Sequence, residues 1–232
     1  MNENMFSLSH TLKTLTGFST SILKNIPDAR LKELNEIFLY PNGDLIPLPS
    51  EYYKNACTHE ELQLWCHIHA VYQLPVLELI DFIAENIEGK AIEIGAGNGS
   101  IGRALKIPVT DSKLQNRKDI ENYYKLLKQP IVKYGSDVLN YEANRAVNKF
   151  KPDTVIGCWI TEWNNYPTAQ SSYWGVDEKN ILRNKKYIFV GNKDVHGLKA
   201  ILKKEHKEYQ FPWLVSRANN QDNNIIYIWE KN

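Results

Sequence analysis

The sequence has few of the features that mark secreted, membrane-spanning or strongly charged proteins. Its three cysteines, Cys57, Cys66 and Cys158, are widely spaced and odd in number, which argues against a disulfide framework and for a reducing compartment. No apolar run reaches the roughly 18 residues of a membrane-spanning helix. The N-terminal residues lack the basic start and apolar core of a secretion signal. We therefore expect a cytoplasmic protein that has no membrane partner.

A large charge of either sign is also absent. The formal net charge is +1 over 232 residues, so the overall charge does not attract the chain to nucleic acid. A local basic patch that binds nucleic acid stays an alternative. There is no internal repeat and no low-complexity tract. Hydrophobic residues make up 43% and charged residues 24%, as in an ordinary globular protein. The length suits one domain with an appendage, or two small domains.

The first part of the chain, up to about residue 88, has the pattern of helices. Apolar residues recur at helical spacing in 28–38, 58–70 and 75–89. Thr58 and Glu61 form a capping-box pattern at the start of the second segment. Residues 1–70 are therefore expected to form a mainly helical region.

After Gly89 the pattern changes to short apolar strands that alternate with helices. This alternation predicts an α/β fold, with a mostly parallel sheet and helices on both faces. Two strands around a polar turn, within 213–231, predict an antiparallel β-hairpin at the C-terminus. The other expected strands are 90–97, 107–112, 131–138, 153–160 and 185–192, and a helix is expected over 198–209.

The stretch "AIEIGAGNGSIGRAL", residues 91–105, contains two overlapping glycine patterns. Read from Gly97 to Gly102 it is G-x-G-x-x-G, which is typical of a dinucleotide-binding loop. That pattern needs an acid about 20 residues further on for the ribose, whereas Asp111 follows Gly97 after only 14. It also leaves Glu93 as an unexplained acid in a buried strand, which is costly without a partner. An NAD-dependent oxidoreductase is thus disfavoured.

Read from Gly95, the same stretch is G-x-G-x-G with Glu93 two positions upstream. Glycines at 95, 97 and 99 let the backbone pass close beside a ligand. Glu93 then lies at the end of a strand, where its carboxylate can accept loop amides or hold an ammonium group. In this register Gly102 is a helix residue that allows close packing on the sheet.

The segment "AIEIGAGNGS" resembles the E-x-G-x-G-x-G signature of class I S-adenosylmethionine (SAM)-dependent methyltransferases. The resemblance covers about residues 71–232 and implies a Rossmann-like, seven-stranded sheet that ends in an antiparallel hairpin. It implies SAM as the cofactor and S-adenosylhomocysteine as its product. Residues 1–70 lie where such enzymes often carry a cap over the substrate.

The resemblance also assigns cofactor-binding positions. The loop Gly95, Ala96, Gly97, Asn98 and Gly99 would hold the methionine part of SAM. Asp111, followed by Ser112, would accept both ribose hydroxyls, although a turn or helix cap is the alternative. Further cofactor contacts are expected from Ser136, Asp137 and Val138 at the adenine, from Cys158 near the sulfonium, and from Tyr72. Asp137 fits a plain turn about as well.

The methyl acceptor is less well defined. The segment "GCWITEWNNYP" departs from the D/N-P-P-Y/F pattern of enzymes that methylate exocyclic amines of DNA bases. Trp159 and Trp163 could form walls for a flat acceptor, and Glu162 could act as a general base. The alternative is that both tryptophans pack against the cap and Glu162 is solvated. Cys158 is interpreted as a small buried hydrophobe and not as a nucleophile.

These patterns predict a methyltransferase that acts on an unidentified oxygen or nitrogen acceptor, either a small molecule or a macromolecule. The alternative is a catalytically inactive SAM-binding module that acts through its N-terminal helices. No metal site is expected, because Cys66 and His69 share a helix face but His67 does not. The lysines of 198–209 are interpreted as a solvated helix face, with a phosphate-binding face as the alternative.

Overall fold

The computed structural model describes residues 26–165, 171–183 and 185–231. Residues 1–25 of the expected cap lie outside this part of the chain. The capping box is formed as expected, because Thr58 accepts a hydrogen bond from the amide of Glu61. The helices before the sheet are α2 (Asp28–Phe38), α3 (Ser50–Ala56), α4 (His59–Ile68) and α5 (Leu77–Asn86).

The main sheet has five strands in the order β1-β4-β7-β9-β8, so the expected count of seven is not confirmed. β1 pairs with β4 and β4 with β7 in parallel, whereas β9 is antiparallel to both β7 and β8. The bounds are β1 (Ala91–Ile94), β4 (Thr154–Cys158), β7 (Lys186–Asn192), β8 (Lys207–Tyr209) and β9 (Asn224–Trp229). Alternation of parallel strands with helices makes this a Rossmann-like α/β fold.

A separate two-stranded ladder lies at the β1 edge of this sheet. It pairs β2 (Thr110–Asp111) with β3 (Leu139–Asn140) in parallel. An isolated parallel bridge joins Glu93 to Val109, and the amide of Ala96 donates to the carbonyl of Thr110 at 3.0 Å. β2 therefore lies beside β1, which brings the carboxyl ends of both strands to one place. A second ladder pairs β5 (Glu162–Trp163) with β6 (Ser171–Ser172).

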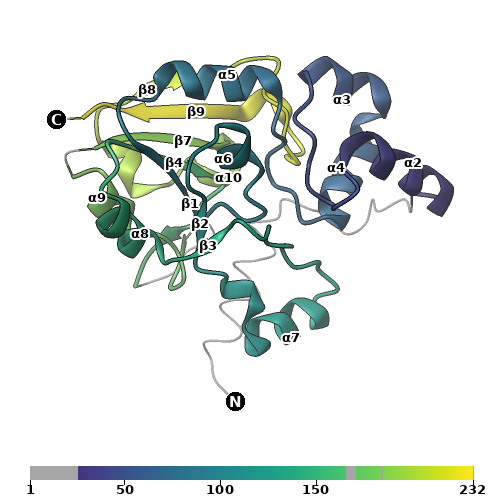
Figure 1. Ribbon diagram of the computed structural model, residues 1–232, viewed down its shortest axis with the longest axis horizontal. Helices are drawn as coiled ribbons and strands as arrows, with labels where there is room; N and C mark the ends of the chain where they lie inside the picture. Colours follow the sequence, from purple (N-terminus) through teal and green to yellow (C-terminus); the bar gives the residue numbers. More distant parts are fainter. Residues whose placement is uncertain (1–25, 166–170, 184, 232) are drawn as a thin grey trace.

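Helices cover both faces of the sheet, as the alternating pattern predicts. α5 packs in one cluster with Ile156, Ile188 and Ile226, while α8 and α9 pack in a second cluster with Tyr187 and Phe189. Figure 1 shows α5 above the sheet, and α7 at the opposite side of the molecule. The remaining helices are α6 (Ser100–Ala104), α7 (Lys118–Leu126), α8 (Ala143–Phe150), α9 (Glu178–Ile181) and α10 (Lys193–His196), with the 3₁₀ turns η2 (Leu114–Asn116), η3 (Ala200–Lys203) and η4 (Gln221–Asn223).

Three expectations about the strands and helices of the C-terminal half were wrong. Residues 131–138 do not form the third strand, which begins only at Leu139. Residues 198–209 are not one helix, because a 3₁₀ turn is followed by strand β8. The antiparallel partner of β9 within the sheet is this β8, and not the segment from 213 that a hairpin required. Sheet pairing at the edge outweighed the helical spacing of the sequence.

Lys199 is not part of a solvated face. Its side chain is completely buried, and its Nζ lies 2.5 Å from Oε2 of Glu178. The hydroxyl of Tyr187 donates to the other oxygen of the same carboxylate at 2.7 Å. A buried lysine is tolerated here because the carboxylate compensates its charge.

The described N-terminal helices share a core with the sheet. Leu34, Phe38 and Trp65 belong to the same buried cluster as Ile156 and Ile188. Figure 1 shows α2, α3 and α4 grouped at one end of the sheet. The packing is continuous across residue 70. None of the helices in the described residues is long and apolar enough to cross a membrane.

Candidate ligand pocket

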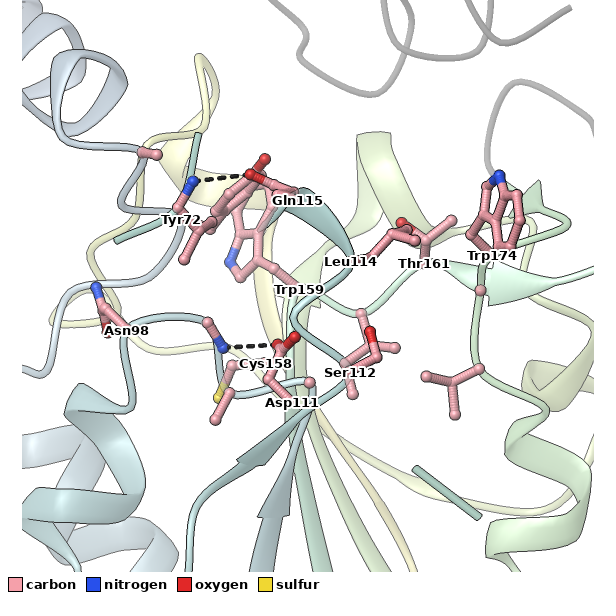
Figure 2. Close-up of a pocket in the computed structure, with 18 of the residues that line it drawn as sticks. Tyr72, Asn98, Asp111, Ser112, Leu114, Gln115, Cys158, Trp159, Thr161 and Trp174 are labelled. Carbon is pink, nitrogen blue, oxygen red and sulfur yellow. Dashed lines mark hydrogen bonds between the residues drawn. The ribbon is translucent and has the colours of Figure 1, made fainter. Parts of the chain in front are cut away.

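A pocket of about 290 Å³ opens where β1, β2 and β4 end. Figure 2 shows side chains from these strands and the following loops converging there. Its walls also include residues from 70–73, from 112–134 and from 171–176, and Arg217. Open α/β sheets bind their ligands at this edge. The fold and the pocket thus define an α/β protein whose candidate ligand site lies at the carboxyl ends of the parallel strands.

The glycine-rich loop has the conformation that the G-x-G-x-G register requires. Gly95, Gly97 and Gly99 have φ angles of 56°, 56° and 78°, in the left-handed region that favours glycine. Gly95 and Gly97 line the pocket, together with Ala96 and Asn98. Gly99 precedes the first residue of α6 and lies outside the lining. The backbone of the loop therefore forms one wall of the pocket.

Gly102 has the packing role expected in this register. A Cβ atom there would lie 2.3 Å from Cγ1 of Val109 and 2.7 Å from Oε2 of Glu93. The glycine thus lets α6 approach the strands closely. Its amide donates a 2.7 Å hydrogen bond to Oε2 of Glu93.

Glu93 is an acid enclosed by the protein. Its side chain is 1% exposed, yet it contributes to the lining of the pocket. Burial raises the pKa of Glu93 to about 8, against the opposing effect of the Gly102 amide. Burial and the neighbouring Glu93 raise the pKa of the Cys158 thiol well above its usual range. Cys158 is thus a neutral wall residue, which fits its interpretation as a small hydrophobe.

The high pKa of Glu93 predicts a pH dependence of stability. In the unfolded chain the carboxyl group titrates near its ordinary pKa of 4.5, so between pH 4.5 and about 8 only the folded state holds the proton. The contribution of Glu93 to the free energy of unfolding therefore falls as pH rises, by at most about 1.4 kcal/mol per pH unit. We expect Glu93→Gln to gain stability relative to the wild type from pH 5 to pH 8 in urea unfolding. A difference that is constant with pH would contradict the buried, protonated carboxyl.

Asp111 is fixed at the end of β2 and faces the glycine loop. Its Oδ2 accepts from the amide of Gly97 at 3.0 Å, and its Oδ1 accepts from that of Lys113 at 2.7 Å. The first of these bonds is drawn in Figure 2. Burial raises the pKa of Asp111, while both amides oppose the rise. Each carboxylate oxygen retains accepting capacity for a ligand hydroxyl.

The expected adenine contacts do not lie in this pocket. Ser136, Asp137 and Val138 are absent from its lining. Asp137 instead forms an ion pair with Arg103, and Val138 is buried. β3 begins only after these three residues, and the side of the pocket where adenine was expected is lined by residues from 114–134. The lining residues there are Leu114, Gln115, Ile120, Tyr124, Val132 and Tyr134.

Trp159 lines the pocket at the end of β4, beside Tyr72, as Figure 2 shows. Its φ angle of 56° is unusual for a bulky residue. The indole Nε1 donates to Oε1 of Gln73 at 3.2 Å, and the ring centroid lies 6.1 Å from that of Tyr72 and 5.2 Å from that of His196. These contacts fix the indole as a wall of the pocket.

Neither Glu162, the expected general base, nor Trp163, an expected wall, is among the residues that line the pocket. Both carboxylate oxygens of Glu162 accept from the amide of Ala200 at 3.1 Å. Thr161, one residue earlier, lines the pocket. Successive side chains of an extended chain point to opposite sides, so Glu162 in β5 points elsewhere. Its carboxylate has a structural role at the start of η3.

Several lining residues have no signal in the sequence. Tyr124, Trp174, His196 and Arg217 come from separate segments, and only the folded chain brings them together. Burial lowers the pKa of His196 well below its usual range, so its imidazole is neutral at pH 7. Cys66, from the histidine-rich helix, is buried in the core, and no metal-binding group of three side chains occurs among the described residues.

No protein-family model and no curated protein matches the chain. Among solved structures, an rRNA methylase from Streptococcus thermophilus is 12% identical, with a TM-score of 0.36, and the match covers 66% of this chain and 93% of that one. A tRNA (uracil-54, C5)-methyltransferase from Pyrococcus abyssi with bound S-adenosylhomocysteine is 15% identical, with a TM-score of 0.36 over 66% and 36% of the two chains. A candidate methyltransferase from Streptococcus mutans, also with S-adenosylhomocysteine, is 14% identical, with a TM-score of 0.36 over 66% and 96%. Any proposal for the ligand therefore rests on the glycine loop and the pocket of this chain, and not on these similarities.

Proposed function

We propose that this protein binds SAM in the pocket and transfers its methyl group to an oxygen or nitrogen acceptor. The observation that carries the proposal is the combination of three left-handed glycines with the carboxyl groups of Glu93 and Asp111. Gly97 leaves space beside the backbone for the amino-acid part of the cofactor, whereas a Cβ atom on Gly95 would meet the side chain of Ile160. Asp111 offers paired acceptors to the ribose hydroxyls. The volume of about 290 Å³ is close to that of small-ligand pockets.

The side chains around the loop suit a flat, apolar ligand. Leu114, Val132 and Tyr134 are suited to contact the adenine ring, in place of the residues expected from the sequence. Trp159 and Tyr72 form the wall at the end of β4, where an acceptor would meet the sulfonium. SAM would supply an electrophilic methyl group there. The protein would contribute alignment of the nucleophile, about 3–3.5 Å from the methyl carbon, and exclusion of water.

A second candidate is a SAM-binding module without catalytic activity. It is favoured by the position of Glu162, whose carboxylate is bound to the Ala200 amide. The only carboxyl groups in the described lining are those of Glu93 and Asp111, and both accept loop or helix amides. If no carboxylate of the lining acts as a general base, methyl transfer needs an acceptor that is already deprotonated, or a neutral amine whose proton leaves to water.

Calorimetric titration with SAM, S-adenosylhomocysteine and NAD tests the cofactor. We expect both sulfur compounds to bind at one site per chain and NAD to bind much more weakly. Tight binding of NAD without binding of SAM would reject the proposal. Consumption of SAM, measured as S-adenosylhomocysteine formed with a panel of alcohols, amines and carboxylic acids, then separates the enzyme from the inactive module.

A further inference from the structure

Arg217 is a buried cation in the pocket wall without an anionic partner. Its side chain belongs to the lining, and the residue is only 4% exposed. Within the described part of the chain no carboxylate forms an ion pair with it, and its buried Nε has no hydrogen-bond acceptor. Its guanidinium carbon lies 3.5 Å from the centroid of the Tyr72 ring. The guanidinium therefore stacks on an aromatic wall, and its buried Nε–H makes no hydrogen bond to the described residues.

The backbone around Arg217 holds this side chain in a defined place. The amide of Arg217 donates to the carbonyl of Tyr72 at 3.1 Å, and Ser216 forms an antiparallel bridge with Gln73. The side-chain amide of Gln73 donates to the carbonyl of Val215 at 2.7 Å and accepts from the indole of Trp159. One glutamine thus links the Arg217 segment to the wall formed by Trp159.

An unpaired buried arginine is unfavourable. Arginine keeps its proton in proteins, so the cost of removing this charge from water cannot be relieved by neutralisation. Stacking on Tyr72 offsets part of this cost. Neither carboxyl group of the described lining forms an ion pair with Arg217; Glu93 accepts from the amide of Gly102 and Asp111 from that of Gly97. A bound anion would complete the arrangement.

The position of Arg217 favours an anion that belongs to the acceptor. Its aromatic neighbour is Tyr72, and Gln73 connects its segment to Trp159 at the end of β4. The loop from Gly95 to Gly99, which would hold the amino-acid part of SAM, makes no polar contact with it among the described residues. A sulfonium and a guanidinium that share one pocket would repel each other. An anionic group between them would remove that repulsion.

We propose that the methyl acceptor is a small molecule with a flat ring and a carboxylate or phosphate group, and that Arg217 binds this anionic group while Tyr72 and Trp159 contact the ring. The proposal rests on the proposed function, because it places the acceptor beside SAM. Arginine suits this role through its planar donors, which can form two parallel hydrogen bonds to one oxyanion. An anion at Arg217 would also fix the orientation of the ring toward the methyl group.

Benzoate, phenyl phosphate and the neutral benzamide are the probes. They are titrated into the protein saturated with S-adenosylhomocysteine and followed by ligand-observed NMR. We expect benzoate or phenyl phosphate to bind about 10-fold or more tightly than benzamide, since hydrogen bonds to a charged group are worth more than neutral ones. Arg217→Gln should remove this preference, and Arg217→Lys should retain part of it.

Arg117→Gln is a matched control. Arg117 also stacks on an aromatic residue of the lining, Trp174, at 4.7 Å, but its guanidinium pairs with Asp119 and is half-exposed. We expect this variant to keep the preference for the anionic probes. Thermal unfolding of each variant verifies that it is folded, and Arg217→Lys serves if Arg217→Gln is not.

The cofactor provides the decisive comparison. S-adenosylhomocysteine and 5′-methylthioadenosine differ by the amino-acid group, so a change at Arg217 that weakens only the former would assign Arg217 to the cofactor's carboxylate and overturn the proposal. Equal binding of benzoate, phenyl phosphate and benzamide to the wild type would overturn it as well. If S-adenosylhomocysteine does not bind to the wild type, the proposed function fails. The titration of the three probes without cofactor then tests the anion site alone. A preference for the anionic probes that Arg217→Gln removes supports the anion site, and the absence of any preference rejects it.

Discussion

Gly97→Val is expected to lower SAM affinity by roughly 100-fold or more while the sheet stays folded. Gly97 has φ 56°, which a β-branched residue adopts only with strain. A Cβ atom there would lie 3.6 Å from Cγ1 of Val132, another lining residue, so the added side chain meets pocket space and not the packed core. Calorimetry with SAM, with circular dichroism as a test of folding, measures the effect.

Gly43→Val is the matched control for this variant. Gly43 also has a left-handed φ, of 85°, but nothing lies within 4 Å of its Cβ position and it is outside the pocket. The backbone strain is therefore similar, whereas the ligand space is untouched. We expect Gly43→Val to lose some stability and to bind SAM as the wild type does. Equal affinity of Gly97→Val and Gly43→Val would show that the loop does not contact the cofactor.

Asp111→Ala is expected to weaken SAM binding by about 1.5–3 kcal/mol, the value of hydrogen bonds to a charged group. The same change removes the acceptors of the Gly97 and Lys113 amides, so part of the loss would come from a looser loop. Asp111→Asn keeps the shape and one acceptor oxygen, and we expect an intermediate affinity. Calorimetric dissociation constants for the three proteins give the order.

Asp137→Ala is the comparison for Asp111. Asp137 is half-exposed, pairs with Arg103 and lies outside the lining. We expect its loss to change SAM affinity less than about 3-fold, because a surface ion pair contributes little. If both alanine variants weaken SAM equally, Asp111 is not the ribose contact that we propose.

Local sequence chemistry determined the glycine loop. Glycines at alternate positions allow left-handed backbone, and the structure places Gly95, Gly97 and Gly99 there. Asp111 could be placed at the end of β2 because a short apolar run precedes it, and strand ends of a parallel sheet meet at one edge. The capping box at Thr58 needed only residues three positions apart.

Tertiary structure decided the remaining walls of the pocket. The late start of β3, at Leu139, moved Asp137 out of the site and Tyr134 into its lining. Glu162 follows a lining residue by one position, so the alternation of side chains along the strand directs its carboxylate away from the pocket, where it accepts from the amide of Ala200.

The sequence by itself determined the α/β alternation, the loop register and the carboxyl groups beside the loop, because each depends on neighbours within a few residues. Only the folded chain placed Arg217 against Tyr72, 145 positions earlier, and paired the buried Lys199 with Glu178. Such pairs depend on which distant segments pack together. Sheet order and side-chain packing determine that choice, and no local pattern records it.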